Sequence, residues 1–421
     1  MNLIDQNFLE AAGKMFYHTW WIVLPAAFYF IFKELWKDFV AFFSKTSWYN
    51  VKKWTMVEVI PPREIEKGPK MMESFFSGIA AVLTTYNTFD EYLKGAFWHD
   101  RFGLELVGEE GKIHFYFRFE TKHRNMIEAQ IYAQYPDAEI IEVEDYYQRF
   151  PKVVPNKNWD LWGTDMEFTA PNIYPIKTYD KFEESVTGEM IDPMAAMCEV
   201  LGTLGPGQHI WLQYILQPLP EPWKKAKSQQ QILDKLTGRE KTDSAGALGH
   251  LGEVFSNIFS GMFGAVEFKK TEKKEQAPLE FRLTPVEKDV LKAVEEKLGK
   301  NVFLSKVRMI VLAKRENFEK SKISAFMGTI KQFSDINMNQ IKPEDITKTY
   351  GKIFFIKRME AFRKRKIWAR YKTRNMDGPK IVLSTKELAS LFHFPDMGVK
   401  SPAVPRTASK LGSAPSNLPI Q

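Results

Sequence analysis

Residues 101–120 read RFGLELVGEEGKIHFYFRFE and carry a strong strand signal. Apolar side chains alternate with polar ones on both sides of the sequence GEEG, which is typical of a turn. A period of two places the alternating side chains on one face of a strand. These residues therefore predict a β-hairpin with one buried face. The apolar positions on that face are Phe102, Leu104, Leu106, Ile113, Phe115, Phe117 and Phe119.

The segments around the hairpin complete a β-α-β-β-α-β unit over residues 54–150. WTMVEVIPP predicts a strand that two prolines end, and residues 63–83 place apolar side chains at helical spacing. After the hairpin, KHRNMIEAQIYAQYP predicts a short helix that ends at Pro136, and AEIIEVEDY predicts a closing strand. This order of elements is that of a ferredoxin-like module. The helical positions are Met72, Phe75, Phe76, Ile79 and Leu83.

Residues 151–397 follow the same plan with an interruption. DMEFTAPNIYPI predicts a strand region, IDPMAAMCEVLGTL a helix, and GPGQHIWLQYILQP a strand that alternates. After an insert at about 220–284 come a helix (TPVEKDVLKAVEEKLG), a strand (VFLSKVRMIVLAKR) and a helix (FEKSKISAFMGTIKQF). KIVLS, residues 380–384, is the candidate for the last strand. We therefore expect an α+β fold of two tandem ferredoxin-like modules, the second with a helical insert.

Two segments lie outside this plan. The insert contains ALGHLGEVFSNIFSGMFG, whose large apolar residues have helical spacing, so it would lie on a bilayer or a partner, or pack on the second module. Residues 398–421 are rich in Pro, Ser and Ala with few large apolar residues, which predicts a disordered tail.

The N-terminal segment, residues 1–53, contains a candidate membrane span. Eighteen residues without formal charge separate Lys14 from Lys33 and would form about 27 Å of helix. We expect a single transmembrane helix at about residues 15–35, with a buried or interfacial helix as the alternative. The anchor positions would be Trp20, Trp21, Pro25, Phe28 and Phe32.

Lysines are unevenly distributed about this stretch. Only Lys14 precedes it, whereas five lysines follow it between residues 33 and 53. Because basic residues are enriched on the cytoplasmic side, the C-terminal bulk is expected in the cytoplasm of a bacterial cell, attached to the cytoplasmic membrane.

Composition and motifs give no support for an enzyme. The chain has 421 residues, a net charge of +7 and a single cysteine, Cys198, which excludes an internal disulfide and a multi-cysteine metal site. No Gly-Lys pair continues into the Ser or Thr of a phosphate-binding loop, and GxSxG, HExxH and CxxC are absent from the sequence. We therefore expect no catalytic residue, no cofactor and no metal.

The most basic stretch is KIFFIKRMEAFRKRKIWARYKTR, residues 352–374, with ten Lys or Arg against the single Glu360. As a helix it would carry an apolar stripe (Ile353, Ile356, Met359 and Phe362) beneath a basic face. Three interpretations remain open: a solvated face, a surface for anionic lipid, and a surface for nucleic-acid phosphates. The candidate contact residues are Lys357, Arg358, Arg363, Lys364, Arg365, Lys366 and Arg370.

Several motifs in order give the chain a resemblance to a known family. PREIEKGPKMMESFFSGI, EAQIYAQYPDAEIIEVEDY, DLWGTDMEF, IDPMAAMCEVL, STKELASLFHFP and the terminal APSNLPI look like the membrane-anchored N-terminal module of type IV secretion and conjugative-transfer ATPases of candidate-phylum bacteria. In the long relatives a segment like APSNLPI precedes a RecA-type motor. This sequence stops there, so no ATPase activity is expected from it.

The resemblance implies a non-catalytic, single-pass membrane component of a type IV secretion or conjugation-like transfer machine. Its partner would be a separately encoded motor ATPase of the VirB4 or HerA type. The alternative is a membrane-tethered nucleic-acid-binding protein that contacts DNA through the basic helix at residues 352–374.

Overall fold

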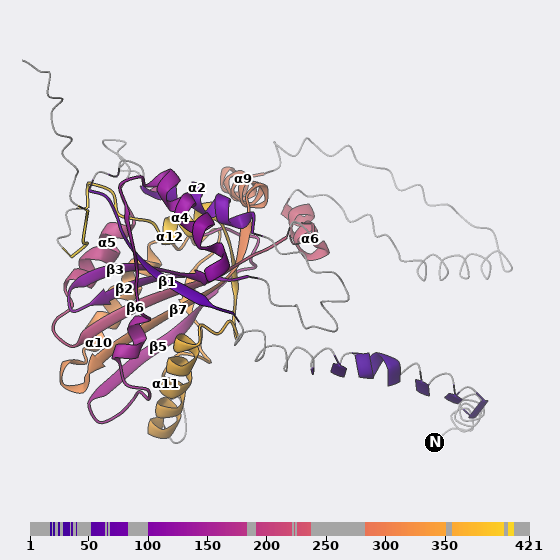
Figure 1. Cartoon of the computed structure of the whole chain (residues 1–421). Coiled ribbons are helices and arrows are strands. Elements are labelled where there is room, and N and C mark those ends of the chain that lie inside the picture. Colours follow the sequence, from indigo (N-terminus) through magenta and orange to yellow (C-terminus); the bar gives the residue numbers. More distant parts are fainter. Residues whose placement is uncertain are drawn as a thin grey trace, which may run out of the picture.

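A computed structural model describes residues 52–82, 100–182, 191–236, 283–350, 356–399 and 403–407, with residues 64, 66, 67, 221, 222 and 224 left out, and short helical pieces between residues 17 and 39. Within these residues one antiparallel sheet of nine strands runs through the body, and helices lie on both of its faces (Figure 1). The fold is α+β overall.

The first half of the sheet has the predicted order of elements. Its hairpin pairs residues in register from Gly103↔Arg118 to Glu109↔Lys112, and Glu110 and Gly111 both have positive φ (50° and 84°), as a tight hairpin turn requires. The strand order is β4-β1-β3-β2, as expected of a β-α-β-β-α-β unit. The elements are β1 (Trp54–Ile60), α2 (Gly68–Ala80), β2 (Phe102–Glu109), β3 (Lys112–Glu120), α4 (Arg124–Gln134) and β4 (Glu139–Glu142).

The second half has the same strand order read from the other end, β6-β7-β5-β8. Its elements are β5 (Trp159–Phe168), α5 (Met194–Gly202), β6 (Gln208–Pro218), α6 (Lys227–Leu236), α9 (Pro285–Gly299), β7 (Val302–Lys314), α10 (Lys320–Lys331), β8 (Ile341–Pro343), α11 (Ile356–Lys372), β9 (Ile381–Ser384) and α12 (Thr385–Leu391).

The expectation for the last strand of this half is wrong. KIVLS does form a strand, β9, but β9 pairs with the start of β7, from Val302↔Ser384 to Ser305↔Ile381. The fourth position, next to β5, belongs to β8. Because β8 has three residues and ends in Pro343, it is too short to show an alternating pattern in the sequence.

The two halves form one sheet. β2 pairs with β6 over eight residues, from Phe102↔Leu216 to Glu109↔His209. The alternating side chains predicted for the hairpin and for β6 all point to the same face, where α2, α4, α5, α10 and α12 cover them in the main core. The two halves therefore share one core, which extends across the paired strands β2 and β6.

The C-terminal helix α12 closes that core. The segment after it places Phe392 against Phe115 and Phe117 of β3 and against Tyr214 of β6, with ring centroids 5.6–5.9 Å apart. Phe394 packs on Tyr135, which follows α4, at 4.9 Å. A segment late in the sequence thus fills the core between helices and strands of the first half.

The transmembrane helix is the part of the expected fold that is overturned. Among the described residues, no helix combines the length and the apolar character needed to cross a membrane. The eighteen uncharged residues on which the expectation rested give about 27 Å of helix, less than the roughly 30 Å of a hydrocarbon layer. The proposed anchor residues Trp20, Trp21, Pro25, Phe28 and Phe32 are helical and exposed.

The insert and the tail are described only in part. Residues 237–282 of the insert, including ALGHLGEVFSNIFSGMFG, and residues 408–421 of the tail lie outside the described residues. The expectation of disorder from residue 398 does not hold for residues 403–407. Val404 is buried, Arg406 donates to the carbonyls of Arg63 and Asp396, and the Thr407 amide donates to Pro61 O.

Phe392→Ala tests how far the two halves depend on one core. Removing this ring leaves a cavity between β3 and β6, so we expect a loss of about 3–5 kcal/mol in the free energy of unfolding. Urea denaturation followed by tryptophan fluorescence and by circular dichroism should still give one shared transition. Met397→Ala, at a side chain that is 55% exposed, is the control and should change little. Two separated transitions in Phe392→Ala would contradict a shared core.

Candidate functional site

The basic stretch forms α11, which lies on the sheet face opposite α2 and α12 (Figure 1). Its inner side consists of Ile367, Trp368 and Tyr371, all buried. Trp211 of β6 meets the rings of Trp368 and Tyr371 at 5.8 and 5.4 Å. This aromatic contact holds the C-terminal half of α11 on the middle of the sheet.

Four buried polar residues cross the sheet beneath α11, one on each of the strands β2, β6, β7 and β5. Glu105, Gln213, Arg308 and Asp165 are direct partners in register and have no exposed surface. Gln213 donates to Glu105 Oε1 at 2.9 Å, and Arg308 donates to Gln213 Oε1 at 3.2 Å and to Asp165 Oδ1 at 2.7 Å. We call these four residues the polar row.

The polar row also caps α11. The guanidinium of Arg308 donates to the carbonyls of Arg370 (2.8 Å) and Asn375 (3.0 Å), and Gln213 donates to Tyr371 O at 3.3 Å. The last carbonyls of a helix lack partners within the helix and carry the negative end of its dipole. A buried cation at this position therefore both satisfies those carbonyls and fixes the place where α11 ends.

Arg374 completes the attachment of α11. It lies just past the helix at φ 49°, where its amide donates to Tyr371 O and the Asn375 amide donates to Arg370 O, the pattern of a Schellman motif. Glycine usually occupies this position because a left-handed conformation costs other residues free energy. Here the side chain compensates: Arg374 donates two hydrogen bonds each to Glu105 (2.8 and 3.1 Å) and to Asp145 (2.5 and 2.9 Å).

Burial and charge oppose each other along the polar row. Burial acts to raise the pKa of Glu105, but the adjacent Arg374, with hydrogen bonds from Tyr146 and Gln213, lowers it below the ordinary value. Burial lowers the pKa of Lys306 to about 8 although its ammonium lies 2.5 Å from Asp165 Oδ2. Every charge in this layer has an opposite charge beside it, so its role is to hold the structure together.

The predicted contact residues divide into two groups. Arg363 donates to the carbonyls of Lys348 and Tyr350, Lys364 is buried against Asp160 and Glu360, and Arg370 lies 3.8 Å from Asp165. These three face the body. The other four are exposed, and none of them forms an ion pair within the described part of the chain: Lys357, Arg358, Arg365 and Lys366.

The apolar stripe of the basic helix was predicted on the wrong side. Ile356, Met359 and Phe362 are 49%, 43% and 63% exposed, and Ile353 lies outside the described residues. The inner side is instead formed by the last two turns, because Trp368 and Tyr371 have the aromatic surface of Trp211 to pack on. We call Met359, Phe362, Arg358, Arg365 and Lys366 together the outer face of α11. Ile356 and Lys357 are exposed as well, but helical spacing places them on the side of Ile367 and Lys364.

Sequence reasoning missed the polar row and Arg374. The signal was a charge at an inward position of an otherwise apolar strand, as for Arg308 in KVRMIVL and Asp165 in GTDMEF. Such a charge is costly unless it is paired, so it points to a buried partner. The sequence does not say which partner.

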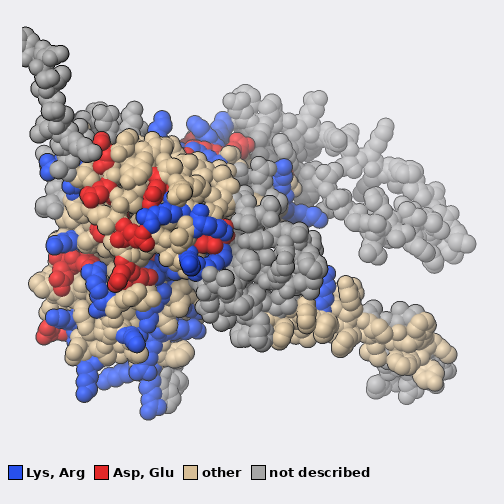
Figure 2. Space-filling model, viewed as in Figure 1, with Lys and Arg blue, Asp and Glu red and all other residues tan. Residues whose placement is uncertain are grey.

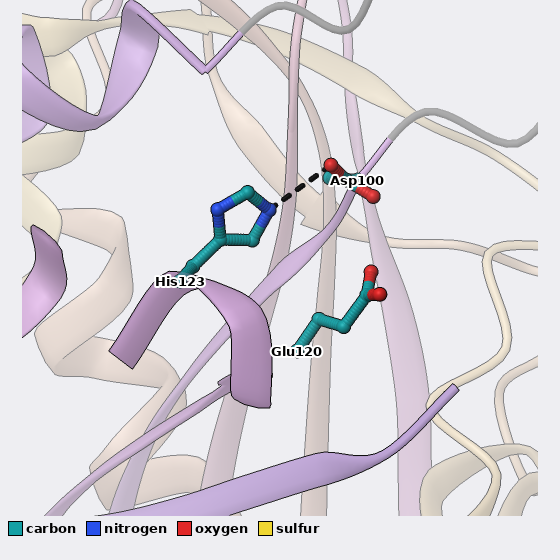
Figure 3. Close-up of side chains that lie close together, drawn as sticks. All are labelled: Asp100, Glu120 and His123. Atoms are coloured by element: carbon teal, nitrogen blue, oxygen red, sulfur yellow. Dashed lines mark hydrogen bonds and ion pairs between the residues drawn. The ribbon is translucent and has the colours of Figure 1, made fainter. Parts of the chain in front are cut away.

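A second cluster has the residue types of a metal site (Figure 3). Oxygen and nitrogen atoms of Asp100, Glu120 and His123 lie within 4.8 Å of one another, and His123 Nε2 is 3.0 Å from Asp100 Oδ2. Two ammonium groups already lie between the carboxylates. Lys52 is 2.8 and 2.9 Å from Asp100 and Glu120, and Lys122 is 2.9 and 3.2 Å from them. The cluster fits a salt-bridged junction between β1 and β3 better than a cation site.

A family model described as a domain of unknown function, DUF8128, matches residues 46–407. No curated protein matches the chain.

Arg374→Met tests the attachment of α11. The change leaves the buried carboxylate of Glu105 without its cation, which should cost about 3–5 kcal/mol in the free energy of unfolding. The double variant Glu105→Gln/Arg374→Met should be more stable than Arg374→Met, because the uncompensated charge is gone. Urea denaturation of the wild type, both single variants and the double variant measures this coupling. Equal stability of Arg374→Met and the wild type would contradict it.

His209, on the same face of the sheet as α11, gives a test in which stability depends on pH. It is buried among Phe150, Trp159 and Trp211, and its Nδ1 has no hydrogen-bond partner among the described residues. Burial lowers its pKa from 6.5 to about 4, with Glu110 opposing and Arg149 adding to the shift. The unfolded chain therefore binds a proton first, and stability should fall from about pH 6.5 to pH 4.

The His209 contribution is about 3 kcal/mol, from the size of the shift. His209→Gln carries no proton in this range, so its stability should depend less steeply on pH. Thermal unfolding of both proteins between pH 7 and pH 4 gives the comparison. Parallel curves for the two proteins would show that His209 is not held neutral.

Proposed function

The chain belongs to the DUF8128 family, whose model covers most of its length. We propose that it is a non-catalytic binding component that holds an anionic, phosphate-bearing partner on the outer face of α11. The observation that carries this proposal is the separation of charges on α11. Its inward cations are paired, while Lys357, Arg358, Arg365 and Lys366 are exposed without a paired acid among the described residues.

The position of these charges along the helix supports the same conclusion. Lys357 and Arg358 lie in the first turn of α11, which contains no acidic residue. Cations at a helix N-terminus oppose the macrodipole and cost helix stability. An anion bound there would interact favourably with both the side chains and the first amides of the helix. Figure 2 shows Lys and Arg side chains projecting from the end of the body where α11 lies.

The rigid attachment of α11 is the second support. The polar row and Arg374 fix its C-terminal half, so the outer face is presented in one orientation relative to the sheet. A surface that is already ordered loses little conformational freedom when it binds. Such an ordered surface suits a component whose role is to position a bound partner.

The resemblance of the sequence to the N-terminal modules of type IV secretion and conjugative-transfer ATPases suggests the setting. In that setting the chain would position a separately encoded motor ATPase of a DNA- or protein-transfer machine. Affinity purification of the full chain from its own cells tests this part. Recovery of an ATPase with a phosphate-binding loop, dependent on this chain, is the expected result, and repeated recovery without one would contradict it.

A second candidate is nucleic-acid binding through the same face. Phe362 and Tyr350 are 63% and 61% exposed, and aromatic side chains among cations are what single-stranded nucleic acids stack on. In this case DNA would be the phosphate-bearing partner.

Arg365→Gln/Lys366→Gln tests the outer face. If each residue contributes about 1 kcal/mol near an anionic surface, removing two should weaken binding about thirtyfold at low salt. The control is Lys320→Gln/Lys331→Gln, which removes two exposed charges from α10 on the other side of the sheet. The probes are single- and double-stranded DNA and vesicles that contain phosphatidylglycerol, measured with the full chain.

Binding should also weaken steeply with added salt, because each engaged cation releases counterions. Two results would overturn the proposal: no binding of the wild type to any of the three probes at low salt, or an equal loss in the α10 control.

A further inference from the structure

The outer face of α11 is apolar as well as basic. Ile356, Met359 and Phe362 are each at least 43% exposed, and they lie within seven residues of one another on a single helix. Solvated faces of helices are polar, and a cluster of large exposed apolar side chains marks a surface that is covered in use.

Helical spacing places Met359 and Phe362 on the exposed side of α11, whereas Ile356, eleven residues before the buried Ile367, lies on the same side as Ile367. Phe362 precedes the buried Tyr371 by nine residues, or two and a half turns, and therefore points in the opposite direction. Met359 lies about one turn before Phe362 and Lys366 about one turn after it. The Lys366 ammonium lies 5.9 Å from the centre of the Phe362 ring. Arg358, Arg365 and Lys366 thus lie beside an apolar centre formed by Met359 and Phe362.

The segment before α11 also carries exposed apolar side chains. Arg363 donates to Lys348 O at 3.1 Å and to Tyr350 O at 2.7 Å, which ties residues 345–350 to the helix. Ile346 and Tyr350 in this segment are 77% and 61% exposed. Large exposed apolar side chains therefore occur on α11 and on the segment that Arg363 ties to it.

This composition selects between the partners that a basic surface can have. Phosphates of nucleic acid would use the cations, and bases could stack on Phe362 and Tyr350. Ile346, Ile356 and Met359 have no aromatic face and no hydrogen-bond donor for either purpose. A bilayer with anionic headgroups uses both kinds of residue, because its phosphates lie directly above acyl chains.

We infer that the outer face of α11 docks on an anionic phospholipid bilayer, with Met359 and Phe362 entering the boundary between headgroups and acyl chains. This inference rests on the proposed function and names its partner. Arg358, Arg365 and Lys366 lie at phosphate level, and their aliphatic stems follow the apolar centre. Because α11 is fixed to the sheet by Arg308 and Arg374, docking also sets the orientation of the sheet toward the membrane.

A local probe on α11 tests this inference in the full chain. Ala369 is exposed and lies about two turns after Phe362 on the same side, so an environment-sensitive dye on Ala369→Cys reports on the outer face alone. Cys198 is buried, and burial raises the pKa of its thiol, so labelling is selective for the new cysteine. The same dye on Asp137→Cys, an exposed position before β4 at the other end of the sheet, is the control.

Vesicles of phosphatidylcholine with and without phosphatidylglycerol are the lipid probes. We expect a blue shift and an increase in emission from the dye at position 369 with anionic vesicles only, and no change at position 137. The variant Met359→Ser/Phe362→Ser keeps every charge, and it should bind anionic vesicles about tenfold more weakly or worse. Its matched control is Ile336→Ser, at a side chain that is 90% exposed outside α11.

The outcomes separate this inference from the proposed function. An unchanged dye signal with anionic vesicles, together with tight and salt-dependent binding of DNA, overturns the lipid assignment and leaves a nucleic acid as the partner. Equal vesicle affinity of Met359→Ser/Phe362→Ser and the wild type also overturns it, because charge alone would then hold the partner. Binding to neither vesicles nor DNA overturns both the inference and the proposed function.

Discussion

The buried guanidinium of Arg308 is the constraint on which this structure depends. A charge in the middle of a nine-stranded sheet is tolerated only where every donor has an acceptor and the charge has a partner. Asp165 and Gln213, on the two neighbouring strands, supply part of this, and the carbonyls at the end of α11 supply the rest. The helix therefore ends above Arg308. Glu105, the partner of Gln213 on β2, is paired with Arg374 just past the end of the helix.

This arrangement divides α11 into two parts with different roles. The last turns carry Trp368 and Tyr371 into the layer over Trp211, where burial of aromatic surface adds to the hydrogen bonds. The first turns carry the outer face, whose charged and apolar side chains are exposed. Because the C-terminal turns of α11 are fixed to the sheet, the outer face has a fixed orientation relative to the sheet. The proposed docking on an anionic surface depends on that orientation.

The face of the sheet opposite α11 is covered by helices, as it is in a single β-α-β-β-α-β unit. Helices of both halves lie there, and α12 with Phe392 joins the two sets across β3 and β6. Since β2 and β6 pair along eight residues, neither half has a free edge at the junction. The polar row crosses this same junction, so the contact between the halves is apolar on the α2 face, whereas on the α11 face the polar pair Glu105–Gln213 lies beside the apolar pair Val107–Trp211.

The sequence by itself determined the local elements. Alternation in FGLELV and KIHFYFRF, and the helical spacing around Phe75 and Phe76, predicted β2, β3 and α2 in their order, because these patterns arise from the geometry of the elements themselves. It also identified the basic helix. Tertiary structure alone decided that β8 and not β9 stands next to β5, that the described residues contain no membrane-spanning helix, and which cations of α11 are exposed. The physical reason is that the partner of a charge, such as Asp160 for Lys364, lies some two hundred residues away, and no local pattern specifies it.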